Sequence, residues 1–193
     1  MDSEPATGLA RTTPGTTPQV IAVVGLSGSG VSTLMQAAAE RMGDRVAVVR
    51  RIITRPAEPG GEDIISVEDR AFRALQDAGL FSVSWYAYGW SYAIPRKLPD
   101  APIVLANLSR LALAQAAAVF PNLAVIHVTA PESLRAARLQ DHGRANPAEL
   151  AARIGRGPDF DRLGLPVHDI DNACDFQTAL DRFCAAIDRI AAG

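Results

Sequence analysis

Residues 20–33 read VIAVVGLSGSGVST. The first five form a continuous apolar run, which is typical of a strand buried on both faces of a parallel sheet. A glycine-rich turn follows, and residues 32–41 then have the pattern of a helix. Strand, glycine-rich loop and helix in this order predict a Walker A phosphate-binding loop over residues 25–33. Its glycines let backbone N–H groups converge on phosphate oxygens, and the helix start adds a favourable dipole.

This loop supplies the candidate residues for binding a nucleotide, which we expect to be ATP. They are Gly25, Ser27, Gly28, Ser29, Gly30, Val31, Ser32 and Thr33. Ser32 holds the position whose hydroxyl ligates Mg²⁺ in such loops, so it is the predicted metal ligand. Mg²⁺ keeps several waters and takes few protein ligands, which fits a single serine.

One position of the loop departs from the Walker A pattern. The pattern has a lysine directly before the serine, and this chain has Val31. That lysine normally contacts the β- and γ-phosphates and follows the charge that develops during transfer. Four arginines are candidates to supply the missing charge, and the sequence does not choose among them: Arg51, Arg55, Arg138 and Arg144.

Further strand patterns cover residues 45–53, 102–106, 123–128 and 167–170, with helical patterns between them. Strands that alternate with helices predict an α/β fold with a doubly wound parallel sheet. Ser66, Ser109 and Asp175 are predicted N-caps, and Gly79 is expected to end the helix that Ser66 begins. Thr129 and Glu132 predict a capping box for a helix over 131–140.

Three segments are expected to stand apart from this core. Residues 1–18, rich in Thr, Pro and Gly, predict a disordered tail before a single P-loop domain over 19–193. Residues 54–96 break the alternation and predict an inserted lobe, with short strands or a hairpin over 81–95. Residues 141–147 lie between two helical patterns, the second over 147–156, and predict a small lid. Arg144 in this lid and Arg138 before it are the candidate catalytic residues, because a lid closing over phosphates excludes water.

Charge and composition exclude some classes of protein. The formal net charge is −2, and of 19 basic residues only Lys97 is a lysine. A general binder of nucleic acid or of anionic membranes would show a basic excess, so neither partner is expected. No apolar run has the length of a membrane span and no signal-peptide pattern is present, so we expect a cytoplasmic protein. Cys174 and Cys184 match no metal spacing and predict buried thiols.

Candidate acceptor-binding residues follow or flank the predicted strands. They are Arg51, Thr54, Arg55, Glu62, Trp85, Tyr92, Asn107, Ser109 and Arg110. Arginines at the carboxyl ends of parallel strands face the ligand crevice, and their planar forks match phosphate. Trp85 and Tyr92 fit the core of the lobe as well as a ligand wall. Glu62 either holds an acceptor hydroxyl or orients Arg55.

Taken together, these motifs resemble the ribose 1,5-bisphosphate phosphokinases of bacterial phosphonate breakdown, which are relatives of guanylate kinase. The resemblance runs from about residue 20 to 191 and rests on five motifs: residues 54–57, 61–62, 84–89, 92–95 and 107–110. It implies a guanylate-kinase-like P-loop fold with an acceptor lobe and a lid. It also implies transfer of the γ-phosphoryl group of ATP to the 1-phosphate of ribose 1,5-bisphosphate, a phosphorylated sugar, giving 5-phosphoribosyl 1-diphosphate.

The departures from this family lie mostly on the donor side. Besides Val31, His142 and Ala145 stand where the family's lid has arginine and glutamate. Ile64 replaces a histidine, and Ala93 replaces a glycine. Two other functions therefore stay open: a catalytically weakened or inactive module that binds a phosphorylated ligand, and a nucleoside monophosphate kinase.

Overall fold

The computed structural model describes residues 17–57, 62–141 and 163–193, and a five-stranded parallel sheet forms its centre. The sheet order is β2 (Val46–Val48), β7 (Ile103–Asn107), β1 (Gln19–Gly25), β8 (Ala124–Thr129) and β9 (Val167–Asp171). Every neighbouring pair is parallel. The predicted α/β fold with a parallel sheet is therefore confirmed.

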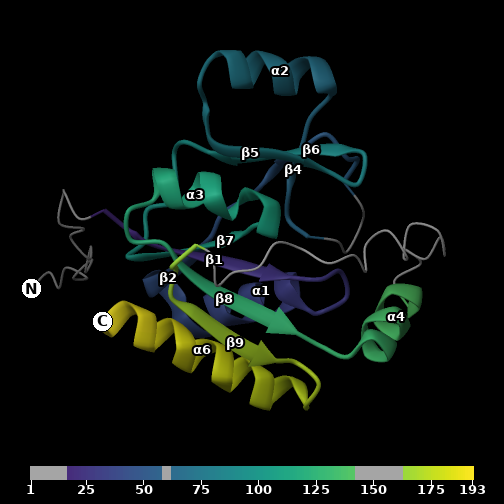
Figure 1. The fold of residues 1–193 in the computed structure, drawn as a ribbon, viewed down its shortest axis with the longest axis vertical. Coiled ribbons are helices and arrows are strands. Elements are labelled where there is room, and N and C mark those ends of the chain that lie inside the picture. The colour runs from purple at the N-terminus through teal and green to yellow at the C-terminus, as the bar shows by residue number, and fades with distance from the viewer. Residues whose placement is uncertain (1–16, 58–61, 142–162) are drawn as a thin grey trace, which may run out of the picture.

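The central strand β1 is buried on both faces, as its continuous apolar run predicts. Ile21 and Val23 pack on one face, against α1 (Val31–Met42) and α6 (Phe176–Ala192). Val20, Ala22 and Val24 pack on the other face, in the cluster that includes residues of α3 (Leu113–Val119) and of a second sheet. Figure 1 shows α6 below the main sheet and the second sheet above it.

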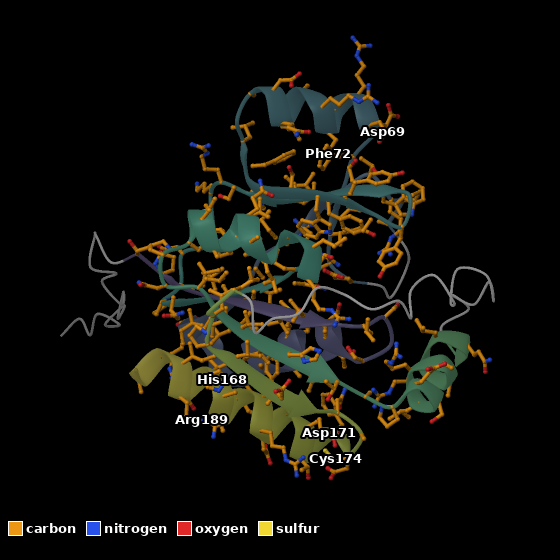
Figure 2. All side chains as sticks on the ribbon, in the orientation of Figure 1. Asp69, Phe72, His168, Asp171, Cys174 and Arg189 are labelled. Carbon is orange, nitrogen blue, oxygen red and sulfur yellow. The ribbon has the colours of Figure 1, made fainter. Side chains whose placement is uncertain are left out.

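The second sheet has the order β4 (Ile65–Ser66), β3 (Ile52–Ile53), β6 (Trp90–Pro95) and β5 (Phe81–Ala87). Helix α2 (Asp69–Asp77) covers its far face, and Phe72 points from that helix onto Ile52 and Ala93 (Figure 2). Tyr88 and Gly89 join β5 to β6 with φ angles of 53° and 82°. Two successive positive φ angles characterise the two-residue hairpin turn that suits twisted strands, so the predicted hairpin is confirmed.

Three sequence predictions were wrong. The predicted strand 45–53 is two strands, because the chain leaves β2 after Val48 and enters the other sheet as β3, where it pairs with β6. Ser66 belongs to β4, where its hydroxyl donates to the Arg55 carbonyl, and Glu68 is the N-cap of α2. Thr129 belongs to β8, and its hydroxyl donates to the Ile170 carbonyl rather than capping α4 (Glu132–Asp141).

Other predicted helix ends are confirmed. The Ser109 hydroxyl accepts from the Leu111 N–H and begins a 3₁₀ turn, η2 (Arg110–Ala112), that continues into α3. The Asp175 carboxylate accepts from the Thr178 N–H at 3.0 Å at the start of α6. Gly79, with φ of 68°, follows the last turn of α2. One further 3₁₀ turn, η1 (Gly43–Arg45), joins α1 to β2.

Several predictions fall at least partly outside the described residues. The helix over 147–156 lies outside them, and of the lid over 141–147 only residue 141 is described. Most of the predicted tail lies there too, and β1 begins at Gln19. Within the described ranges, no helix combines the length and the apolar character that crossing a membrane requires.

Candidate active site

A single cleft of about 1470 Å³ receives side chains from both sheets. The phosphate loop and the start of α1 line it on one side, and the second sheet and the segment after β7 line it on the other. Most of the predicted site residues line this cleft: Gly25, Ser27, Gly28, Gly30, Val31, Ser32, Thr33, Arg51, Arg55, Glu62, Trp85, Tyr92, Asn107, Ser109, Arg110 and Arg138.

Three predicted site residues are not among those that line the cleft. Ser29 is buried, only 1% exposed. The Thr54 hydroxyl accepts from the Ser91 N–H at 3.0 Å, so Thr54 joins β3 to β6. Arg144 and the rest of the predicted lid after residue 141 lie outside the described residues.

The phosphate loop depends on glycine at two positions. Gly28 and Gly30 have φ angles of 82° and 93°, which L-residues with side chains rarely adopt. A Cβ on Gly28 would lie 2.6 Å from the Arg135 carbonyl oxygen, and one on Gly30 would overlap the amide nitrogen of Asn172. Gly30 is also the N-cap of α1, and no side chain within the described ranges caps this end.

The start of α1 is therefore open to the cleft. The first hydrogen bond of the helix runs from the Leu34 N–H to the Gly30 carbonyl at 3.0 Å. Backbone N–H groups of residues 31–33 come before this bond and have no acceptor within a helix of this geometry. Such groups, together with the helix dipole, favour an anionic ligand.

The Val31 side chain does not replace the missing lysine. It is 9% exposed and belongs to the core cluster that contains Leu34 and Met35. A cation that lines the cleft beside the loop is Arg138 of α4, which donates to the Gly28 carbonyl at 3.3 Å and to the Asn172 carbonyl at 3.0 Å. Of the four arginines that the sequence left open, Arg138 is the one whose recorded hydrogen bonds reach the loop.

Two buried residues that were not predicted as site residues donate hydrogen bonds to backbone carbonyls of the phosphate loop. Asn172 is 5% exposed, and its side-chain N–H donates to the Ser29 carbonyl at 2.7 Å. Arg135 is 6% exposed and donates to the Ser27 carbonyl at 3.5 Å. Asn172 directly follows β9, and its place at a strand end is a signal that could have identified it. Arg135 has no comparable signal.

A hydrogen-bonded network joins the phosphate loop to the opposite side of the cleft, through Glu62, Arg51 and Asn107. The Ser32 hydroxyl donates to Glu62 Oε2 at 3.2 Å, and Asn107 Nδ2 lies 3.2 Å from the same oxygen. Arg51 donates from Nε to Glu62 Oε1 at 2.9 Å and from Nη2 to Oε2. The expectation that Glu62 orients Arg55 is thus wrong, because both carboxylate oxygens pair with Arg51.

Arg51 also lies over the aromatic ring of Tyr92. Its guanidinium carbon lies 5.4 Å from the centre of the Tyr92 ring, a distance at which a cation is attracted to the ring face. Trp85 stacks on Tyr92 with ring centres 5.3 Å apart and an angle of 7° between the planes. Both rings belong to a small core cluster, and both line the cleft.

Arg55 presents a polar group without a partner. Its Nε is buried and makes no hydrogen bond to the described part of the chain, although the side chain lines the cleft. A buried N–H that lacks an acceptor costs free energy, roughly 1–3 kcal/mol. An anionic ligand in the cleft would supply that acceptor.

The two thiols differ in their surroundings. Cys184 is buried, and this burial raises the pKa of its thiol. Cys174 is half-buried and lines the cleft, so the prediction of two buried thiols is wrong for this one. It follows Asp171 in the loop that connects β9 to α6 (Figure 2). The described ranges contain no group of three or more His, Cys, Asp or Glu residues placed for a metal ion.

Comparison with known proteins bears on this arrangement. Over 179 residues the chain is 40% identical to the ribose 1,5-bisphosphate phosphokinase PhnN of Rhizobium etli, covering 90% of this chain and 91% of that protein. It is 42% identical over 180 residues to the protein of the same name from a Ruegeria species, covering 89% and 92%. The chain belongs to the PhnN family.

Solved structures show the fold of this PhnN family member. Guanylate kinase from Anaplasma phagocytophilum matches with a TM-score of 0.62 and 20% identity, over 89% of this chain and 86% of that one. A gluconokinase from Sinorhizobium meliloti matches with a TM-score of 0.54 and 22% identity, over 91% and 94%. The predicted guanylate-kinase-like P-loop fold is confirmed. No family model matches the chain.

Proposed function

We propose that this PhnN family member transfers the γ-phosphoryl group of ATP to the 1-phosphate of ribose 1,5-bisphosphate, forming 5-phosphoribosyl 1-diphosphate and ADP. The observation that carries the proposal is the cleft that the phosphate loop and the second sheet line together. Donor and acceptor would meet in it, since phosphoryl transfer needs both held in line. The relatives named above carry the name of this activity.

On the donor side, the phosphates of ATP would lie on the amides at the start of α1. Ser32 would hold Mg²⁺ together with phosphate oxygens and water, and the metal would neutralise charge on the transferring group. In other P-loop proteins the Walker A lysine compensates part of the phosphate charge. Arg138 would compensate part of it here, because its hydrogen bonds to the Gly28 and Asn172 carbonyls hold it against the loop.

On the acceptor side, Arg55 and Arg110 would bind the phosphates of the sugar. Both line the cleft, and the buried Nε of Arg55 makes no bond within the described chain. Guanidinium groups match phosphate oxygens in pairs. The second sheet and α2, which lie within residues 52–57 and 62–95, would act as the acceptor lobe.

The proposed transfer needs no strong general acid or base from the protein. An oxygen of the sugar 1-phosphate, already ionised at neutral pH, would attack the γ-phosphorus, and the bond from that phosphorus to the β–γ bridging oxygen would break as ADP leaves. The protein supplies position and charge compensation. No proton needs to be removed from the acceptor, so the reaction requires no general base. The carboxylates among the described lining residues are Glu40, Glu62 and Asp63.

The test is a ³¹P NMR assay with MgATP and ribose 1,5-bisphosphate, with a Gly30→Asp variant as the blocked-loop control. We expect 5-phosphoribosyl 1-diphosphate to appear with the wild-type protein and not with the control. Wild-type turnover equal to that of the control would remove the enzyme proposal. Offering GMP as the acceptor separates this activity from that of a nucleoside monophosphate kinase.

A second candidate function is a binding module that has lost catalysis, and the buried Val31 favours it. Val31→Lys separates the two functions. A kinase that works despite the missing ammonium should gain turnover, since a charge-assisted contact is worth about 1.5–3 kcal/mol. Ligand binding without any gain in turnover would favour the module.

A further inference from the structure

The Ser32 hydroxyl donates its hydrogen bond to a residue outside the main sheet, Glu62. We infer that Glu62 is a positioning residue for the metal site: it accepts the Ser32 hydroxyl proton and thereby aims an oxygen lone pair of Ser32 at Mg²⁺. This inference rests on the proposed function and assigns Glu62 a role in metal binding instead of acceptor binding. It also links the second sheet physically to the phosphate loop.

The geometry of the serine supports the first step. A hydroxyl ligates a cation through a lone pair, so its proton must point elsewhere, to an acceptor. Ser32 Oγ lies 3.2 Å from Glu62 Oε2, to which it donates. Asn107 Nδ2 lies 3.4 Å from the same hydroxyl and 3.2 Å from Oε2, so it bridges the two groups. With its proton held by Glu62, the hydroxyl keeps a lone pair for a ligand in the cleft.

In the main sheet, neither of the two strands beside β1 ends in a carboxylate that could accept the Ser32 hydroxyl proton. In other P-loop proteins an aspartate near this edge helps to hold Mg²⁺. Here the neighbouring strands β7 and β8 end in Asn107 and Thr129. Thr129 donates to the Ile170 carbonyl, and Asn107 can only donate through the nitrogen that faces Ser32. The carboxylate comes instead from residue 62, three positions before β4.

Glu62 is held in one orientation. Arg51 pairs with both of its oxygens, and the two side chains are 11% and 19% exposed. The position of Arg51 over the Tyr92 ring fixes the arginine in turn. A carboxylate clamped in this way cannot turn to present another face to the cleft. Its fixed position is what a residue that orients a metal ligand needs.

Asp63 provides a matched control, because it is the adjacent carboxylate and also lines the cleft. It pairs with Arg50 at 2.9 Å, and both side chains are more than half exposed. None of its recorded bonds reaches Ser32. Asp63→Ala therefore removes the same charge from the same segment and leaves the serine network intact.

The experiment measures ADP affinity by titration calorimetry, once with excess Mg²⁺ and once with EDTA. The ratio of the two dissociation constants reports how much the metal tightens binding. Loss of an orienting partner typically costs 10–100-fold in metal affinity. We expect the ratio to fall about tenfold or more in Glu62→Ala and to stay at the wild-type value in Asp63→Ala.

A double variant excludes a general loss of structure. If Glu62 acts through the serine hydroxyl, Glu62→Ala should change the ratio little once Ser32→Ala is present. An equal effect of Glu62→Ala in both backgrounds, or equal weakening with Mg²⁺ and with EDTA, would overturn the inference while the kinase proposal stands. A wild-type protein that binds no ADP in either buffer would overturn the proposed function and this inference with it.

Discussion

A methyl group added at Gly30 would meet the side chain of Asn172 well inside van der Waals contact. Gly30 has φ of 93°, and a residue with a Cβ in the left-handed region costs about 1–2 kcal/mol. To make room, Asn172 would have to release the Ser29 carbonyl, to which it now donates at 2.7 Å. A buried polar group left without its partner costs about 1–3 kcal/mol.

Gly30→Ala should therefore lower the free energy of unfolding by about 2–5 kcal/mol. The matched control is Gly79→Ala. Gly79 has φ of 68°, and an added Cβ there meets no atom of the described residues within 4 Å. Only the backbone strain applies to Gly79→Ala, so this substitution should lower the free energy of unfolding by about 1–2 kcal/mol.

Urea unfolding followed by far-ultraviolet circular dichroism measures both losses. Calorimetry with MgADP adds a second readout: Gly30→Ala should lose affinity because Gly30 lines the cleft, and Gly79→Ala should keep it. Equal destabilisation of the two variants would show that the contact between Gly30 and Asn172 carries no free energy, and would refute the role given to Asn172.

Three further predictions concern single side chains. Hydrogen bonds from the Thr178 side chain and from its backbone N–H lower the pKa of the Asp175 carboxyl. The stabilisation from this cap is therefore present above the unfolded pKa of about 4 and is lost as the pH falls through the folded value. Asp175→Ala should thus lower the melting temperature at pH 7, and the difference from wild type should shrink below about pH 4; a constant difference would contradict the cap. At pH 8 a disulfide reagent should modify Cys174 in the folded protein and Cys184 only after unfolding, because burial raises the pKa of the latter thiol; equal rates would contradict this. Arg138→Met should raise the dissociation constant of MgADP about tenfold or more, since charged hydrogen bonds are worth about 1.5–3 kcal/mol; an unchanged constant in calorimetry would remove Arg138 from the donor site.

Local pattern was enough to predict the centre of the fold. The apolar run of β1, the glycines of the loop and the helix after them are neighbours in sequence, and each constrains the next. The predicted strand over 45–53 failed because its apolar residues continue across a change of sheet. Where the chain leaves β2 depends on pairing of Ile52 and Ile53 with Ala93 and Tyr92, about forty residues later.

Lining of the cleft was predictable for residues that directly follow a strand. Asn107 and Arg110 were predicted in this way, and both line the cleft. The partner of Glu62 was not predictable, because Arg51 and Arg55 are both close to it in sequence and only the folded chain selects Arg51. Arg135 was missed because its helical segment carries no pattern that distinguishes a buried arginine from an exposed one.

The placement of the tryptophans has a practical consequence. The chain has two, Trp85 and Trp90, and both lie on the β5–β6 hairpin of the second sheet. Intrinsic fluorescence therefore observes the unfolding of that hairpin, whereas circular dichroism is dominated by helices such as α1 and α6 on the main sheet. Melting curves from the two signals would superimpose if both sheets unfold in one cooperative step, and an earlier fluorescence transition would reveal that the hairpin half opens first.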